Sequence, residues 1–483
     1  MKRRFTHIYI PFLIGLLGLG FMSSCDKNLY TKDGKLRYSA DTVLFDTSFT
    51  QVGSLTRRIV VKNTNARDIR INKVYLENGH QSAFRINVDG FSGPLVEEID
   101  VLSGDSVFIF IESTIDPTGS TGQLFEDDHI VVDYANGPDK LYLAAPGSDA
   151  IYYFPNDTLQ DNLGRKYPVR ILQGNHEWVE GKPVVIVGTL VMDAGAVLTM
   201  QPGTRVHMFN GAMLWIYKGA TLKILGERNR KVVIEGTRLG SAYAQLAGQW
   251  DRIWINEGST EHEIRNAIIK NGRLGIQAGG LDMSDGFTPR YLKIENTSIY
   301  NMSNSCFLAM NYEVEAKNLF INNFNNYGIA LVLGGKYTFN HITVAGYQSG
   351  TRPSAGFYFS NAYAEYIAAM QLNVENSILY GNNPTELGYD QISGTAFDYM
   401  FRNCLIKIDP KIDTENSFYP GLIKNKDPRF YAPYFYDPSL LHDSPARDSA
   451  DISYSNANMF DYHGKNRLID GRPDIGCAEY KGD

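Results

Sequence analysis

Acidic and histidine side chains are the groups with which this chain could catalyse a reaction, and they are sparsely placed. Hydrolysis of a glycoside needs two facing carboxylates, and an elimination needs a proton acceptor beside acidic groups. The candidates nearest the expected repeats are the acidic group Asp251, Glu257, Glu261 and Glu263 and the single histidines His262 and His341. No metal-ligand spacing, nucleophile elbow or phosphate-binding loop occurs, so we expect no catalytic residue, metal or cofactor to stand out. This weakens the case for an enzyme without closing it.

Aromatic residues crowd a later stretch of the chain, in and beside an expected loop at residues 351–364. Exposed aromatic rings can stack on flat partners such as sugar rings. We therefore take Tyr358, Tyr363 and Tyr366 as candidate ligand-facing residues. The alternative is that these rings fill the core and cover loops.

The elements that would position such residues follow from a repeat between Gly188 and Gly226, where glycine recurs at steps of seven or eight. Between the glycines lie apolar pairs, which are Leu190/Met192, Leu198/Met200, Val206/Met208, Leu214/Ile216 and Leu222/Ile224. Each pair predicts a short strand with one buried face, and each glycine allows a tight turn. Three such strands make one coil of 24 residues, so Leu214 would lie directly above Leu190.

This repeat predicts a right-handed parallel β-helix whose coils lie about 4.8 Å apart. The pattern resembles the opening coils of pectin-lyase-like β-helix proteins. The alternative is a series of antiparallel hairpins, which would show less regular steps. We assign residues 150–410 to the β-helix, and we expect residues 152–174 to cover its open N-terminal end.

A second motif, apolar-x-Asn-x-x-apolar, recurs after residue 237. Its third positions are Asn266, Asn296, Asn318, His341, Asn376 and Asn403. Stacked coils would bring these residues into one column, where amides bond to each other and to turn backbone groups. We expect a structural role for this column, and we expect Trp250 to pack inside where a loop re-enters the coil.

Residues 38–148 alternate in the manner of about seven short strands separated by turn signals such as Asn78-Gly79 and Asn136-Gly137. The run Arg57–Asn63, followed by Ile69–Ile71, resembles bacterial Ig-like modules that precede larger surface domains. This resemblance implies an Ig-like β-sandwich. We favour the role of a spacer over that of a ligand-binding domain.

The N-terminus combines Lys2, Arg3 and Arg4 with an apolar run that ends at Ser23-Ser24-Cys25. A basic start, a short apolar stretch and small residues are typical of an export signal. The sequence before Cys25 resembles a bacterial lipobox, which implies that residues 1–25 are a lipoprotein signal and that Cys25 carries lipid. A signal peptide with a chance cysteine is the alternative. We expect residues 26–37 to be a tether and the protein to be lipid-anchored in the cell envelope, with the outer membrane as the expected site.

Residues 411–483 end in Asp474-Ile475-Gly476, which resembles the closing segment of bacterial surface β-helix proteins. This resemblance implies a segment that covers the last coil. A calcium site at Asp461, Asp470 and Asp474 is a weak alternative to salt bridges with the nearby arginines. Besides Cys25 the chain has three cysteines, Cys306, Cys404 and Cys477, and their pairing is left open.

The charge composition excludes some classes of function. The net charge is −7 without a basic block, which argues against a nucleic-acid partner. We favour a non-catalytic, adhesin-like surface protein that binds glycans or other cell-surface polymers. The alternative is a polysaccharide lyase or glycoside hydrolase whose site lies on the loops. A scaffold without a ligand is a third hypothesis.

Overall fold

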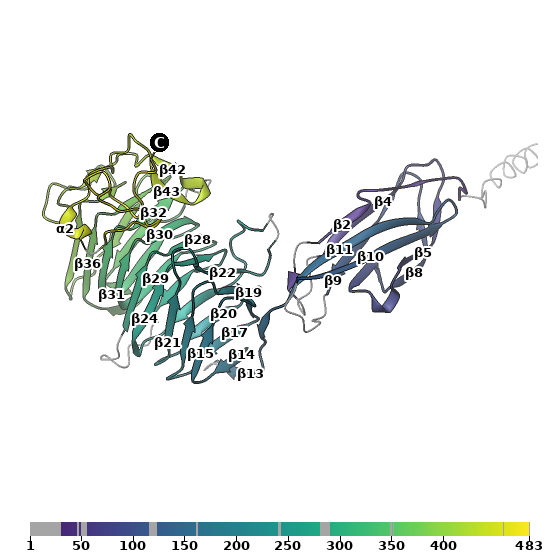
Figure 1. Ribbon diagram of the computed structural model, residues 1–483, viewed down its shortest axis with the longest axis horizontal. Helices are drawn as coiled ribbons and strands as arrows, with labels where there is room; N and C mark the ends of the chain where they lie inside the picture. The colour runs from purple at the N-terminus through teal and green to yellow at the C-terminus, as the bar shows by residue number, and fades with distance from the viewer. Residues whose placement is uncertain are drawn as a thin grey trace, which may run out of the picture. The chain divides into compact units, whose positions relative to one another are not determined.

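The computed structural model divides the chain into two compact units, Met1–Ser148 and Asp149–Asp483 (Figure 1). The residues it describes are 30–45, 48–49, 56–114, 123–160, 163–239, 243–280, 290–347, 350, 352–456 and 458–482. The expected signal peptide, Cys25 and the first part of the tether lie outside these residues. Within them, no helix is long and apolar enough to cross a bilayer.

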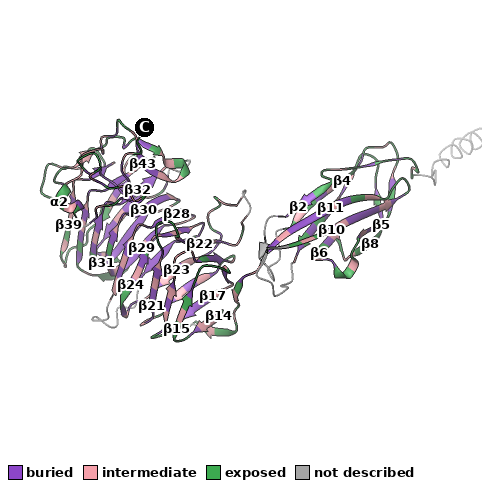
Figure 2. Cartoon of the chain, viewed as in Figure 1, coloured by how far each residue is buried: buried purple, intermediate pink, exposed green. Residues whose placement is uncertain are grey.

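The first unit consists of two β-sheets that enclose one apolar core. The first sheet contains, in spatial order, β1 (Leu36–Tyr38), β4 (Arg57–Asn63), β9 (Ser106–Ser113), β6 (Phe84–Val88) and β7 (Phe91–Ser92). The second contains β2 (Thr42–Leu44), β11 (Asp139–Ser148), β10 (Gln123–Tyr134), β5 (Ile69–Leu76) and β8 (Leu95–Val101), with β3 (Ser48–Phe49) beside β11. Buried and exposed residues alternate along most of these strands (Figure 2), as expected for sheets with one face in a core.

The second unit is a parallel β-helix, which confirms the predicted fold class. Its strands form three parallel ladders, which we call the aromatic, charged and covered faces. The aromatic face is β14 (Lys166–Leu172), β17 (Thr189–Met192), β20 (Met213–Ile216), β23 (Arg252–Ile255), β26 (Ile276–Ala278), the starts of β29 (Phe307–Lys317) and β31 (Ile329–Asn340), β33 (Phe357–Ser360) and β38 (Leu387–Asp390).

The charged face is β15 (Asn175–Trp178), β18 (Val197–Met200), β21 (Thr221–Leu225), β24 (Ser259–Arg265), β27 (Arg290–Glu295), the ends of β29 and β31, β36 (Met370–Glu375) and β39 (Phe397–Arg402). The covered face is β12 (Ile151–Tyr153), β16 (Val184–Ile186), β19 (Arg205–Met208), β22 (Val232–Gly236), β25 (Ala267–Lys270), β28 (Ser298–Met302), β30 (Phe320–Phe324), β32 (Thr343–Gly346), β37 (Ile378–Gly381), β40 (Leu405–Ile406) and β41 (Ile423–Lys424).

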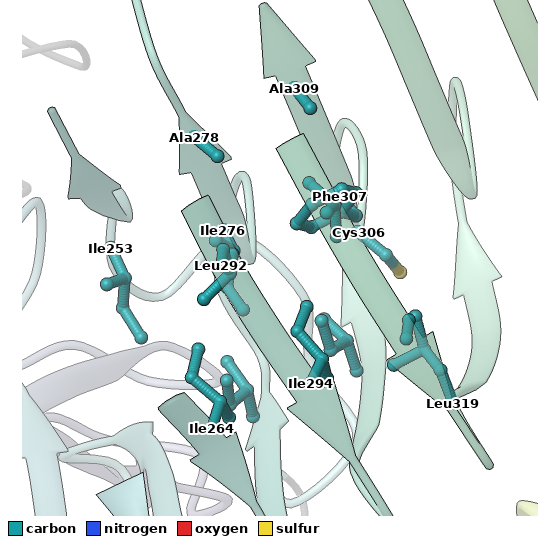
Figure 3. Close-up of a cluster of buried hydrophobic side chains, with 14 of the residues drawn as sticks. Ile253, Ile264, Ile276, Ala278, Leu292, Ile294, Cys306, Phe307, Ala309 and Leu319 are labelled. Carbon is teal, nitrogen blue, oxygen red and sulfur yellow. The ribbon is translucent and has the colours of Figure 1, made fainter. Parts of the chain in front are cut away.

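The coils lie in the predicted register. Leu190 is the parallel partner of Leu214, and Leu198 is the partner of Leu222. The inward side chains of successive coils therefore stack into one continuous core. Figure 3 shows this stacking further along the chain, where Ile253, Ile276 and Phe307 follow one another across neighbouring strands.

The predicted asparagine column occupies one corner of the coils. All six of its members have positive φ, between +47° at Asn266 and +51° at His341 and Asn318. Asparagine adopts this left-handed conformation more readily than most residues, and glycine serves the early turns in the same way. The amides also bond along the column, since Asn318 Nδ2 donates to Asn296 Oδ1 at 2.8 Å. Both observations support the structural role expected for the column.

The C-terminal segment differs in part from the expectation that it closes the last coil. Residues near β41 do so, because β41 pairs with β40 and Tyr419 packs against Phe401 with ring centroids 5.8 Å apart. Residues 427–482, which we call the clasp, instead return along the side of the β-helix. The clasp and the covered face share a second apolar core, whose members include Phe320, Ile378, Leu405, Phe430, Leu440 and Ile475.

The cysteines are packing residues. Cys306, Cys404 and Cys477 are free and buried. Burial raises the pKa of the Cys404 and Cys477 thiols to about 12, so both are protonated at neutral pH and chemically inert.

Candidate functional site

The three faces of the β-helix present different outward side chains. On the charged face one outward column alternates in sign over four coils, with Lys223, Glu263, Lys293 and Glu315 as successive register partners. The covered face packs under the clasp over its later coils, where Tyr300 stacks on Tyr436 with ring centroids 4.4 Å apart and Phe320 belongs to the shared apolar core. The aromatic face carries apolar and aromatic outward residues over its first coils, and the candidate site lies there.

The site is a groove of about 730 Å³ that crosses β14, β17, β20 and β23. One outward column forms its floor, in which Ile171, Val191, Trp215 and Trp254 are register partners in successive coils. Because an indole is much larger than an aliphatic side chain, Trp215 projects further from this column than Val191 does and borders the groove on one side. Tyr167, on the hairpin of β13 (Asp157–Gln160) and β14, lines the groove and is 43% exposed.

The two tryptophans are held as a stacked pair. Their ring centroids lie 5.0 Å apart with 6° between the planes, which matches the rise of one coil. Trp254 Nε1 donates to the carbonyl oxygen of Gly279 at 2.9 Å, and Trp215 Nε1 donates to Asn256 Oδ1. Tyr217 packs edge-on against Trp215 at 5.5 Å and is 42% exposed. Both indole N–H groups are satisfied, so the rings are fixed before any ligand arrives.

Polar groups border the aromatic floor. Asp251 Oδ1 is 2.6 Å from an Arg273 nitrogen, and Asp251 Oδ2 is 3.1 Å from Arg252 Nε. Asp193 Oδ2 accepts a hydrogen bond from Gln173 Nε2 at 2.9 Å. Asp193, Asp251 and Arg252 also line the groove. An apolar, aromatic cleft with a few fixed polar groups is the usual form of a small-molecule or sugar site.

The three predicted tyrosines lie elsewhere on the β-helix. Tyr358 belongs to the same outward column as Trp254, with Gln277, Leu308 and Ala330 between them. Its hydroxyl donates to Asp390 Oδ2 at 2.7 Å.

Tyr363 and Tyr366 face each other across the small hairpin of β34 (Ala362–Tyr363) and β35 (Tyr366–Ile367), and they are 46% and 40% exposed. None of the three predicted tyrosines lines the groove. The role of these tyrosines as ligand contacts stays a prediction, and Trp215 and Trp254 form a separate aromatic site.

The candidate catalytic residues do not converge. Glu261 pairs with Lys223 at 2.6 Å on the exposed surface, whereas Glu257 is buried and lies 3.7 Å from Lys218. His262 is buried, with its Nδ1 accepting from the backbone N–H of Leu222 at 3.1 Å. Among the described residues there is no group of three or more His, Cys, Asp or Glu side chains that could hold a metal ion.

The aspartates considered for calcium bind backbone amides. Asp461 accepts from Lys465 N and Glu479 N, and Asp474 accepts from Asp448 N and Tyr480 N. Asp470 lies 3.7 Å from Arg447. These contacts hold the turns of the clasp together, and the calcium site stays a prediction.

The sequence pattern does not predict the tryptophan pair, because Trp215 and Trp254 are far apart in the sequence. Trp215 lies in the regular repeat between buried Leu214 and Ile216, a pattern that marks it as outward-facing. Trp254 follows an insertion that spans residues 237–251, so only the register of the folded coil shows that the two rings meet. Trp250 is 1% exposed and donates from Nε1 to the Lys270 carbonyl oxygen, which agrees with its expected role in packing.

Fold and site together define a two-unit, all-β protein whose parallel β-helix carries an open aromatic groove. No protein-family model matches the chain, and no curated protein matches it. Solved structures that resemble it include a protein of unknown function from Porphyromonas gingivalis, at 13% identity and a TM-score of 0.18, over 30% of this chain and 59% of that one.

Two further structures resemble parts of the chain. A PapD-like domain of human CEP192 matches at 12% identity and a TM-score of 0.17, over 26% of this chain and 94% of that one. The catalytic domain of a GH87 alpha-1,3-glucanase, in complex with tetrasaccharides, matches at 11% identity and a TM-score of 0.25, over 79% of this chain and 92% of that one. Likenesses of this size assign neither a family nor an activity.

Proposed function

We propose that the β-helix binds a polysaccharide in the aromatic groove, with sugar rings lying against Trp215 and Trp254. The stacked tryptophan pair is the observation that carries this proposal. The apolar C–H faces of a sugar suit an aromatic wall, and its hydroxyl groups suit the polar border. Asp193, Asp251 and Arg252 supply acceptors and donors at that border.

The organisation of the other faces supports the choice of this groove. On the charged face, cations pair with carboxylates of a neighbouring coil, as Lys223 does with Glu261 and Lys336 with Glu313. The covered face is occupied by the clasp over its later coils. A ligand that docks on the aromatic face therefore displaces neither the ion pairs of the charged face nor the clasp.

A glycan array, combined with a polysaccharide degradation screen, tests this proposal. The protein used is the chain from Asp26 onward, which keeps every described residue. We expect binding that is weakened in Trp254→Ala and unchanged in Tyr363→Ala, which alters an exposed aromatic outside the groove. Loss in Tyr363→Ala with retention in Trp254→Ala would instead favour the tyrosines named from the sequence.

A glycoside hydrolase or polysaccharide lyase acting in the same groove is the second candidate. Asp193 and Asp251 are two carboxylates that line the groove beside Arg252. A hydrolase needs one carboxylate as an acid and a second as a base or nucleophile. Turnover of any polysaccharide that disappears in Asp193→Asn or Asp251→Asn would establish this candidate and replace the purely binding role.

We also propose where the protein acts. Cys25 carries lipid and tethers the protein to the cell envelope, at the outer membrane, while the Ig-like first unit serves as a spacer. The support is the basic start, the apolar run and the Ser23-Ser24-Cys25 motif. Metabolic labelling with a tagged fatty acid tests this anchoring. The label should be absent from Cys25→Ser, and a labelled Cys25→Ser protein would contradict it.

A further inference from the structure

The outer face of the first sheet in the first unit carries cations from three strands. We call it the cationic face. Its positively charged members are Arg37 on β1, Arg58 and Lys62 on β4, and Arg85 on β6. All four are exposed. Phe108 and Phe110 point outward from β9, which lies between β4 and β6.

The pairing of β1 with β4 and of β4 with β9 places the cations close to each other and to the two phenylalanines. Arg37 is the antiparallel partner of Lys62, which places two like charges opposite each other on one face. Such pairs are destabilising across neighbouring strands. Arg58 is opposite Phe110, and its guanidinium carbon lies 5.1 Å from the centre of the Phe108 ring. Phe110 is 39% exposed.

The charge on this face is not balanced by its neighbours. Among the described residues, none of the four cations forms a salt bridge. Glu112 is the carboxylate on the outward positions of β9, where it lies opposite Arg85 and accepts from Thr56 Oγ1 at 2.6 Å. The excess positive charge is unusual for a chain whose net charge is −7.

The outer face of the second sheet shows the opposite arrangement. Its cations are paired, as Arg70 with Asp100 at 2.8 Å, Lys73 with Glu97 at 3.3 Å and Lys140 with Glu77. The two sheets of one small unit therefore differ in whether their cations have partners. A partner from outside the chain that carries negative charge would complement the first sheet and not the second.

We propose that the cationic face rests on an anionic lipid surface. The cations are spread over three strands of one sheet with aromatic side chains between them, so several of them can reach phosphate headgroups of one membrane surface. The proposal is independent of glycan binding.

The position of the chain start supports a lipid partner over a soluble one. Four residues lie between Cys25 and Tyr30, the first described residue, so the five residue-to-residue steps can span at most about 17 Å. Lipid on Cys25 would keep Tyr30, which packs against Arg70 and Asp100 of the second sheet, within that reach of the bilayer, and would thereby raise the concentration of headgroups around the whole first unit. A single lipid anchor is strengthened by a basic surface that binds the same membrane.

Vesicle cosedimentation tests the proposal without the lipid anchor. The chain from Asp26 onward is mixed with phosphatidylcholine vesicles, with and without phosphatidylglycerol. We expect binding only to the anionic vesicles, and we expect high salt to abolish it. Each basic residue near an anionic surface contributes about a fivefold gain in affinity, so Arg37→Ala/Arg58→Ala/Lys62→Ala should bind about 100-fold more weakly.

The matched control is Arg70→Ala/Lys73→Ala/Lys140→Ala, which removes the same charge from the second sheet. It should bind as the wild type does, and thermal unfolding of both variants checks that the first unit remains folded. Equal loss in both variants, or equal binding to neutral and anionic vesicles, would overturn the proposal. Retention on heparin without binding to anionic vesicles would overturn it as well, in favour of an acidic polysaccharide.

Discussion

Asn376 and His341 hold the same corner in successive coils of the β-helix. Their φ angles are +48° and +51°, and Asn376 Nδ2 lies 3.1 Å from His341 Nε2. The column therefore accepts histidine where its other members are asparagine. The corner requires a residue that tolerates the left-handed backbone conformation and carries a polar atom that can bond to the next coil. Asparagine meets both requirements with a short side chain.

Substitution of Asn376 separates these two requirements. Asn376→Gly keeps the backbone conformation but loses the bonds to His341 and to Asp451 of the clasp. Asn376→Ala loses the same bonds and also strains the backbone, by about 1 kcal/mol. We expect the order of stability to be wild type, glycine variant and alanine variant in urea unfolding. An alanine variant as stable as the glycine variant would show that the positive φ is relieved by local movement.

In a β-helix, the sequence pattern predicts the register of coils that have equal length. A regular step of eight residues was enough to place Leu190 under Leu214, because each coil in that stretch has the same length. The path of the clasp could not be predicted in this way, since its contacts join residues far apart, such as Asn318 and Asn458. The groove could not be predicted either. An insertion before Trp254 breaks the fixed step, so the sequence does not show that Trp254 is the register partner of Trp215.

The two tryptophans of the segment Trp250–Ile255 should respond in opposite ways to truncation. Trp250 is 1% exposed, so Trp250→Ala should lower the free energy of unfolding by about 3–5 kcal/mol. Trp254 lies in the groove wall, so Trp254→Ala should cost about tenfold in glycan affinity while the protein remains folded. Unfolding curves and binding isotherms of both variants check this. Equal destabilisation by the two substitutions would remove Trp254 from the role of a ligand contact.

Acid should destabilise the β-helix through its buried histidines. Burial lowers the pKa of His262 to about 4, and burial lowers that of His207 to about 4 as well. The unfolded chain takes up these protons near pH 6.5 and the folded chain does not, so stability falls as pH drops from about 6.5 to about 4. Each histidine contributes up to about 3 kcal/mol to this loss.

Unfolding measured across that pH range in His262→Gln tests the assignment. The variant should lose less stability between pH 6.5 and 4 than the wild type, by about one proton of linkage. An unchanged slope in His262→Gln would mean that His262 gains a proton in the folded state as readily as in the unfolded one.

Arg467 should anchor the clasp to the β-helix. It is fully buried, and its guanidinium donates to Glu479 within the clasp and to Asn318 Oδ1 of the asparagine column at 2.7 Å. Arg467→Ala would leave the buried Glu479 carboxyl without its charged partner, which typically costs about 3–5 kcal/mol. The clasp covers the outward apolar residues Phe320 and Ile378, so its release should also expose new protease sites.

Limited proteolysis and urea unfolding of Arg467→Ala measure both effects. We expect early cleavage within residues 427–482, followed by loss of the β-helix at lower urea than in the wild type. Arg472→Ala is the matched control, because Arg472 is exposed on the same segment and its loss should change stability by no more than about 0.5 kcal/mol. If the two variants are cleaved at the same rate, the clasp is held by its apolar core alone and the buried ion pair adds nothing to its attachment.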